Sequence, residues 1–224
     1  MKILKNFFLF GFLFLVFFSL LAFSSCKKEN SLVSYVSDLR CNQYYGKSEN
    51  FSLSASYGFR EKPFISDGKV GERVYALKIK LLDKVLDPAS YFVSFVHEGI
   101  SYSGEFTLSQ TGGYVAEFEM ENFFINSFTV NLSVASTTET ITLSSTLPPN
   151  TLTFDKTLDS LNKTQSELIL AYTENGEFTA EIYARIIVKD DKPYWYIGFA
   201  KADGLKAFLI DGFTGEVLAI RSVF

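Results

Sequence analysis

Histidine and cysteine, the side chains that hold many protein-bound metals, are nearly absent from this sequence. His97 is the only histidine, which excludes any motif that needs two histidines, such as His-Glu-x-x-His. The phosphate-binding pattern Gly-x-x-x-x-Gly-Lys and the nucleophile elbow Gly-x-Ser-x-Gly are missing as well. We therefore expect a protein that is not an enzyme and that holds no metal and no cofactor.

The remaining candidates for acid or base chemistry have simpler interpretations. His97 follows Val93 and Phe95 in alternation at the end of an expected strand, which favours a structural histidine over a general base. Asp190 and Asp191 form a carboxylate pair. They lie in the charged segment 189–192, which we expect to be a solvated hairpin turn. No catalytic residue is predicted.

The first 26 residues have the layout of a bacterial export signal, with Lys2 and Lys5 ahead of an apolar run over 7–23. The run ends in Phe23-Ser24-Ser25-Cys26, which resembles a lipobox, although Phe23 stands where bacterial lipoproteins usually have Leu or Val. The resemblance implies that Cys26 receives a diacylglycerol and that residues 1–25 are removed as a signal peptide. Two acyl chains on Cys26 would hold the protein on the extracytoplasmic face of the cell membrane.

Two alternatives to lipidation remain open. Ala22 and Ser24 also satisfy ordinary secretory cleavage after Ser24. The apolar run is also at the short edge of the roughly 17 to 25 residues that cross a bilayer, so the leader could stay as an anchor. Cys41 has no partner in the chain if Cys26 is acylated, and could pair with it in a disulfide if not.

Charge argues against two classes of partner. Cleavage before Cys26 removes Lys2 and Lys5 but no acid, which changes the net charge from −4 to −6. A mildly acidic exterior disfavours nucleic acid and anionic lipid headgroups as partners. Contact with the membrane is expected through the N-terminal lipid alone.

The exported part is expected to be mainly β, with some α+β character. Residues 26–44 are polar and lack sustained periodicity, so we expect a flexible tether after the lipidated cysteine. Within 45–148, alternating segments predict seven short strands and an immunoglobulin-like β-sandwich, although the Cys-Trp-Cys pattern of antibody domains is missing and a small barrel remains open. The expected strands are 51–59, 75–81, 91–97, 100–108, 114–120, 128–134 and 141–143.

Pro148-Pro149 cannot continue a central strand, and we place a domain boundary there, giving a second domain over 149–224. A helical period over 158–172 is followed by four strands that form an antiparallel meander, so this domain is expected to be a helix on a four-stranded sheet. If Val188 pairs with Pro193, Trp195 lies opposite Ile186 on the core face and Tyr196 lies opposite Arg185 on the other.

The expected helix of the second domain, the strands after it and the ending Leu209-Ile210-Asp211-Gly212-Phe213-Thr214-Gly215-Glu216-Val217-Leu218 look like a PepSY-type domain, a similarity that covers about the last 75 residues. The whole chain also resembles uncharacterised exported lipoproteins of clostridia-like, low-GC Gram-positive bacteria, through Ala55-Ser56-Tyr57-Gly58-Phe59-Arg60-Glu61 and Pro193-Tyr194-Trp195-Tyr196-Ile197-Gly198. The PepSY resemblance implies a domain that restrains or modulates a peptidase of the cell envelope. The chain carries no peptidase domain of its own.

One surface is a candidate ligand site. Tyr183, Arg185, Tyr194 and Tyr196 are expected on the face of the hairpin opposite Trp195, where rigid aromatics beside a guanidinium suit a peptide or a sugar. The same residues would also stabilise a sheet without any ligand, or pack on the sandwich. Two functions follow as hypotheses: a surface lipoprotein that binds an envelope partner such as a peptidase, and a module that binds cell-wall glycan or peptide.

Overall fold

The computed structural model describes residues 31–63, 69–82, 90–109 and 112–223. The segment Leu32–Phe224 forms one compact unit. Cys26 and the leader lie outside the described residues, so the lipidation and the signal peptide stay predictions. No helix in the described part of the chain is both long enough and apolar enough to cross a bilayer.

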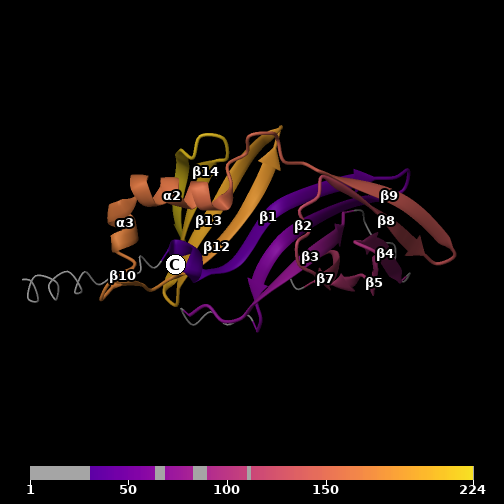
Figure 1. Cartoon of the computed structure of the whole chain (residues 1–224), viewed down its shortest axis with the longest axis horizontal. Helices are drawn as coiled ribbons and strands as arrows, with labels where there is room; N and C mark the ends of the chain where they lie inside the picture. The colour runs from indigo at the N-terminus through magenta and orange to yellow at the C-terminus, as the bar shows by residue number, and fades with distance from the viewer. Residues whose placement is uncertain (1–30, 64–68, 83–89, 110–111, 224) are drawn as a thin grey trace, which may run out of the picture. The chain divides into compact units, whose positions relative to one another are not determined.

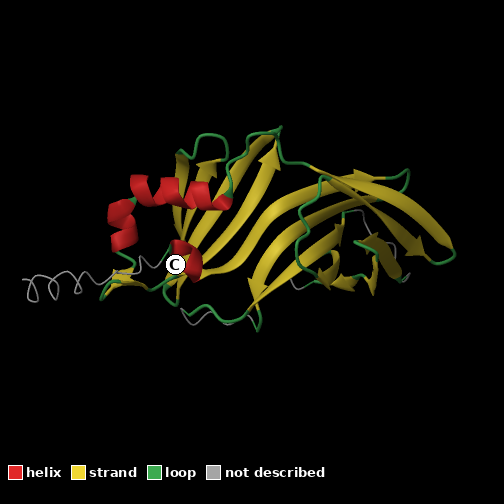
Figure 2. Cartoon of the chain, in the orientation of Figure 1, coloured by secondary structure: helices red, strands yellow, loops and turns green. Residues whose placement is uncertain are grey.

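Strands dominate the unit, which confirms the mainly β fold expected from the sequence. Two short helices and a 3-10 turn accompany them (Figure 2). The elements are η1 (Leu32–Tyr35), β1 (Val36–Lys47), β2 (Ser52–Glu61), β3 (Arg73–Leu81), β4 (Tyr91–His97), β5 (Ile100–Glu105), β6 (Thr107–Leu108), β7 (Tyr114–Glu119), β8 (Ser127–Val134), β9 (Thr137–Ser145), α2 (Phe154–Thr164), α3 (Ser166–Leu170), β10 (Thr173–Glu174), β11 (Glu177–Phe178), β12 (Glu181–Lys189), β13 (Lys192–Lys201), β14 (Gly204–Asp211) and β15 (Val217–Val223).

A single sheet of 13 strands runs through the unit (Figure 1). Its main path is β15-β14-β13-β12-β1-β2-β3-β7-β6, and β9, β8, β4 and β5 continue from β1 as a second layer. The junction is a parallel pairing in which Val36 of β1 lies beside Ile182 of β12 and Arg40 lies beside Arg185. The expected PepSY-like arrangement of one helix on a four-stranded sheet over 149–224 is therefore wrong: its four strands belong to the larger sheet and continue into the sandwich through β1, without a break at Pro148-Pro149.

The sheet has one apolar face, and two different layers cover it. Tyr57 and Phe59 of β2 are two residues apart, so their side chains point to the same face. Tyr57 belongs to one buried cluster and Phe59 to the other. The two cores are thus neighbours on one side of one sheet, and the opposite side, which we call the outer face, carries the polar positions of the same strands.

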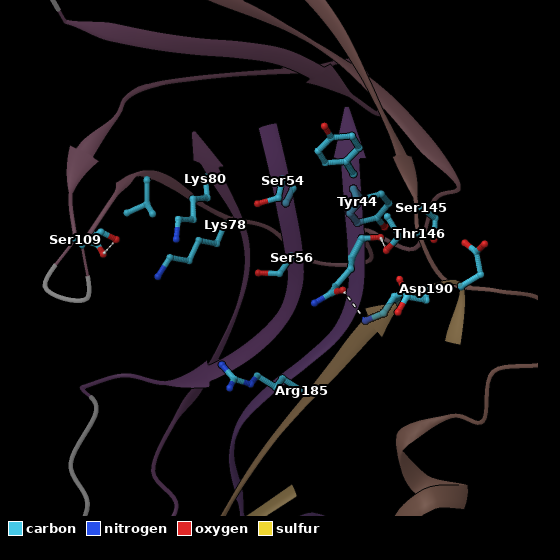
Figure 3. A pocket seen from close by; sticks show the side chains of 17 residues that line it. Tyr44, Ser54, Ser56, Lys78, Lys80, Ser109, Ser145, Thr146, Arg185 and Asp190 are labelled. Atoms are coloured by element: carbon cyan, nitrogen blue, oxygen red, sulfur yellow. Dashed lines mark hydrogen bonds between the residues drawn. The ribbon is translucent and has the colours of Figure 1, made fainter. Parts of the chain in front are cut away.

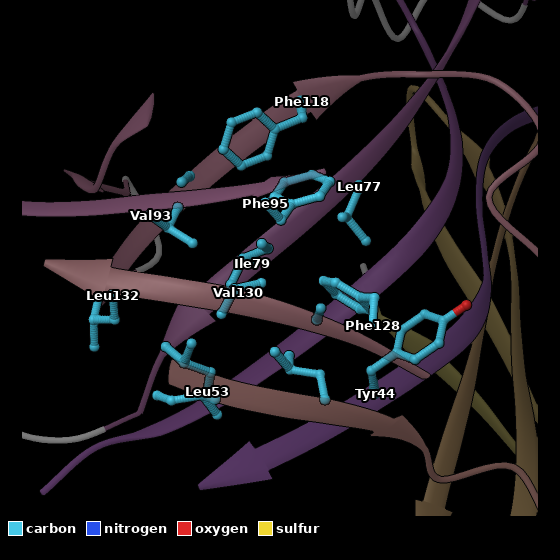
Figure 4. Close-up of a cluster of buried hydrophobic side chains, with 14 of the residues drawn as sticks. Tyr44, Leu53, Leu77, Ile79, Val93, Phe95, Phe118, Phe128, Val130 and Leu132 are labelled. Carbon is cyan, nitrogen blue, oxygen red and sulfur yellow. The ribbon is translucent and has the colours of Figure 1, made fainter. Parts of the chain in front are cut away.

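The first core has the layout of a β-sandwich. Strands β4, β5, β8 and β9 close over β1, β2, β3 and β7, and the seven strands expected from alternation are all present. Aromatic rings meet edge to face in its centre, with Tyr44 5.3 Å from Phe128 and Phe95 5.1 Å from Phe118 between ring centroids (Figure 4). Such edge-to-face pairs stabilise beyond their buried area.

The second core lies under the helices. Phe154, Leu158 and Leu161 of α2 pack with Trp195 and Phe199 of β13. The register expected for β12 and β13 is confirmed, with Val188 opposite Pro193, Trp195 opposite Ile186 and Tyr196 opposite Arg185. The expected helix over 158–172 begins earlier, at Phe154, and is broken at Gln165 into α2 and a short α3.

Strand β1 corrects the prediction of a tether up to Tyr44, because it is a central strand with partners on both sides. Its register against β2 shifts between Arg40 and Asn42, so that Cys41 is the extra residue of a β-bulge. Leu39 packs against the second core, whereas Tyr44 is buried in the first. The inward-facing position is thus odd at Leu39, before the bulge, and even at Tyr44, after it. This shift interrupts the alternation of apolar and polar residues by which a strand is predicted from sequence.

The thiol at this bulge should react slowly. Cys41 is unpaired, and its Sγ–H donates to the carbonyl of Tyr57 at 3.6 Å. Burial raises the pKa of Cys41 from 9.0 to about 11, which lowers the thiolate fraction at pH 8 about 100-fold. In a full chain carrying Cys26→Ser, iodoacetamide should therefore alkylate Cys41 about 100-fold more slowly in the folded protein than in urea. The folded protein favours the neutral Cys41 thiol, so burial of this thiol contributes to stability. The contribution is complete below pH 9 and is lost as the pH rises through 11. An alkylation rate equal in folded and unfolded protein would contradict this.

Candidate functional site

A groove of about 920 Å³ opens on the outer face where β12 leaves β1 and β9 takes its place beside β1. Strand β1 pairs with β12 only as far as Arg40 and with β9 from Tyr44 onward. We call this the fork groove. Figure 3 shows Lys78, Lys80 and Arg185 beside it. Its lining comprises Gln43, Tyr44, Tyr45, Ser54, Ala55, Ser56, Lys78, Lys80, Ser109, Gly112, Val115, Ser145, Thr146, Arg185, Val188, Asp190 and Asp191.

Gln43 holds the fork together. Its side-chain Nε2 donates to the carbonyl of Ile186 at 2.7 Å, and its Oε1 accepts from the backbone N–H of Val188 at 3.4 Å. On the other side, the Gln43 carbonyl accepts from the backbone N–H of Thr146 at 2.9 Å. The amide thus replaces the ladder between β1 and β12 beyond Arg40 and fixes the floor of the groove.

Replacing Gln43 by alanine should destabilise the protein by about 1–3 kcal/mol, because it leaves two backbone groups of β12 without their partner. Urea denaturation would measure the loss, and the backbone amide of Val188 should exchange hydrogen faster. Asn162→Ala, which removes an exposed amide on α2, is the matched control. Equal stability of the two variants would show that the fork does not depend on Gln43.

The floor beside the groove carries several charges in close range. Arg40 Nε lies 3.1 Å from Asp38 Oδ1, and Arg60 Nη2 lies 2.8 Å from Glu117 Oε1. Burial raises the pKa of Asp38, and the positive charges of Arg40, Arg60 and Lys78 work against that rise. Asp38 is therefore held among several cations on the sheet surface.

The four residues predicted as a ligand surface lie on the outer face of β12 and β13. The guanidinium carbon of Arg185 stands 5.0 Å from the ring centroid of Tyr196, and the hydroxyl of Tyr183 donates to Glu181 Oε2 at 2.8 Å. Tyr183 lies opposite Gly198, as expected. Arg185 alone among the four lines the fork groove, so Tyr183, Tyr194 and Tyr196 flank that groove rather than form it.

His97 and the acid pair have the surroundings expected for structural positions. The His97 ring lies edge-on to Phe123, 4.7 Å between centroids, beside a second cavity of about 560 Å³. Asp190 and Asp191 form the β12–β13 turn and are exposed. Among the described residues, no group of three or more His, Cys, Asp or Glu side chains is placed to hold a metal ion.

Sequence reasoning missed Gln43, Asp38 and Arg40 as members of a site, because they fall in the segment taken for a tether. Lys78 and Lys80 alternate with the buried Leu77, Ile79 and Leu81 of β3 and therefore lie on the outer face. Their position on the same groove as Arg185 depends on the pairing of β1 with β12, two strands that are about 145 residues apart. Local periodicity contains no signal for such a pairing.

Comparison with known proteins adds no family to this geometry. No family model matches the chain, and no curated protein or solved structure matches it either. The fork groove and the outer face therefore have to be interpreted from their own chemistry.

Proposed function

We propose that the protein is a non-catalytic binding module, held on the extracytoplasmic face of the cell membrane by a lipid on Cys26, that captures an envelope partner through its outer face. The observation that carries the proposal is the fork groove. Helices and the second strand layer both lie on the apolar face, whereas the polar face offers a hollow of about 920 Å³ lined by cations, hydroxyls, two tyrosines and two aspartates. Ligand sites are typically such concave surfaces with a few convergent polar groups.

The partner class that we favour is a peptide or a peptide-bearing envelope protein. Arg185 and Tyr196 next to the groove provide a planar cation stacked on an aromatic ring, a combination frequent at protein-binding surfaces. The resemblance of the last hairpin to PepSY-type domains supports an envelope peptidase as one such partner. A cell-wall glycan is the alternative ligand, because the half-buried tyrosine rings of the outer face also suit sugars.

The anchoring part of the proposal is tested by Cys26→Ala in full-length protein expressed in a Gram-positive host. Wild-type protein should incorporate labelled fatty acid and sediment with membranes. The variant should incorporate none, and it should be released if the lipid is the only anchor. Continued sedimentation of an unlabelled variant with an intact leader would instead support the uncleaved anchor.

The binding part is tested by comparing wild type with Arg185→Ala/Tyr196→Ala in two assays, retention on purified cell wall and capture of a defined set of envelope peptidases. The double variant should lose binding while unfolding at nearly the wild-type urea concentration, since an exposed cation–π pair contributes only about 0.5–1 kcal/mol. Lys163→Ala/Leu170→Ala, exposed positions of α2 and α3, is the control. Equal binding by both double variants would reject the outer face as the binding surface.

A further inference from the structure

The fork groove is lined by three positively charged side chains, of which Lys78 also lies within electrostatic range of Asp38. Lys78 and Lys80 lie on β3 and Arg185 on β12, and none of the three forms an ion pair within the described part of the chain. Each of the two lysines alternates with buried leucine or isoleucine, so the pleat of β3 directs both toward the groove (Figure 3). Three cations facing one hollow in an acidic protein favour a ligand with a negative group.

A second observation points to the same chemistry. Arg40 and Arg185 are direct neighbours in the parallel ladder between β1 and β12, both on the outer face. Like charges placed directly opposite each other destabilise a sheet. Asp38 compensates one side of Arg40, but Arg40 Nη1 is buried and has no hydrogen-bond partner among the described residues. An anion bound beside Arg185 would relieve this repulsion.

The opposite wall of the groove carries negative charge. Asp190 and Asp191 form the turn between β12 and β13, and both line the groove. Their two charges would repel a polyanion that filled the whole hollow. A ligand with a positive group at this end and a negative group at the lysine end satisfies both walls.

We propose that the fork groove binds an extended peptide that carries a carboxylate and an amine about four residues apart. The inference rests on the proposed binding function and specifies its ligand. From β3 to β12 there are three strand spacings, on the order of 14 Å. An extended peptide covers about 3.3–3.6 Å per residue, so roughly four residues separate its two charges. The carboxylate lies among Lys78, Lys80 and Arg185, and the amine lies at Asp190 and Asp191.

The test uses the full chain in detergent and octapeptides of Gly and Ser that contain one Glu and one Lys, four positions apart, in both orders. Comparison peptides carry two Glu, two Lys, or neither, and an uncharged glycan oligomer is the last probe. One of the two mixed-charge peptides should bind at least about tenfold more tightly than every comparison probe, and its binding should weaken with salt.

Two double variants test the two charged walls of the groove separately. Lys78→Gln/Lys80→Gln and Asp190→Asn/Asp191→Asn should each weaken the mixed-charge peptide about tenfold, and Asn suits the positive φ of the turn. The first should leave the two-Lys peptide bound no more weakly, and the second should leave the two-Glu peptide bound no more weakly. Lys156→Gln/Lys163→Gln and Asp159→Asn/Glu167→Gln, on the exposed side of α2 and α3, are the matched controls and should change nothing.

The remaining outcomes each decide the question. Tighter binding of the two-Glu peptide, unaffected by the Asp190/Asp191 variant, would overturn the need for an amine. Tightest binding of the uncharged glycan, equal in all variants, would overturn the inference and leave the binding function standing. Retention of cell wall or peptidase by the outer face without any peptide binding would likewise overturn only the ligand class. If no probe, cell wall or peptidase is retained, the proposed function fails as well.

Discussion

Replacing Gly58 by alanine is expected to destabilise the protein severely. A Cβ atom built on Gly58 would lie 1.7 Å from the carbonyl oxygen of Leu39 and 2.7 Å from its carbonyl carbon. Real Cβ atoms do not approach other atoms below 3.0 Å, so the backbone of β1 would have to move. That backbone is the bulged part of β1, and it is hydrogen-bonded to β2 on one side and to β12 on the other.

The loss of stability should be large because no flexible side chain lies next to the added Cβ atom. The three atoms nearest to the added Cβ all belong to the main chain of Leu39 and Arg40, so no side chain can rotate away. A movement of this backbone would separate β1, the strand that both cores share, from its neighbours β2 and β12. We expect a loss of about 4 kcal/mol or more, a large part of the roughly 5–15 kcal/mol that stabilises a typical domain.

Two controls distinguish this steric effect from a general cost of removing glycine. Gly176 has a φ of +83° and open space around its Cβ position, so Gly176→Ala should cost only about 1–2 kcal/mol of backbone strain. Ser56→Ala changes the same strand on the outer face and should cost less than 1 kcal/mol. Circular dichroism during thermal unfolding would rank the three. A Gly58→Ala protein that unfolds close to the wild-type temperature would mean that the bulge of β1 adjusts freely.

The sequence was informative where the side-chain period is uninterrupted. In β12 and β13 the alternation continues for about nine residues in each strand, and the pairing of Trp195 with Ile186 was predicted correctly. The seven sandwich strands were found for the same reason. In β1 the bulge at Cys41 shifts the period, so one of the most important strands was taken for a tether.

The site was predictable only in part, because it is made by contacts between distant segments. Tyr183, Arg185 and Tyr196 were placed on one face correctly, since a local hairpin brings them together. The fork groove needs the parallel pairing of β1 with β12, and no alternation within either strand specifies that partner. The same pairing explains why two proline residues did not mark a boundary: the chain turns there, but the sheet continues through β1.

The connector after those prolines is fixed to the sheet by the one tryptophan of the chain. Trp195 is 1 % exposed, and its ring centroid lies 5.6 Å from that of Phe154. Its Nε1–H donates to the carbonyl of Leu152 at 2.9 Å, and the N–H of Leu152 donates to the carbonyl of Gly212 at 2.7 Å. The indole therefore joins the connector, α2 and the meander.

Trp195→Ala should destabilise the protein by about 3–5 kcal/mol, the usual cost of deleting a buried tryptophan side chain. Trp195→Phe keeps most of the ring but leaves the Leu152 carbonyl without its donor, so it should cost about 1–3 kcal/mol. Phe213→Ala, at a ring that is 40 % exposed, is the control and should cost less than either. Urea denaturation followed by far-UV circular dichroism measures all three.

The number of transitions in that experiment tests the architecture itself. Because β1 is shared by both cores, Trp195→Ala should shift a single unfolding transition of the whole unit, including sandwich strands that lie far from the tryptophan in sequence. Two independent domains would respond differently: the part containing Trp195 would unfold early, and the sandwich would unfold at its wild-type urea concentration. A split transition would therefore show that the continuous sheet does not couple the two cores, and the fork groove between β12 and β9 would then lose its fixed floor.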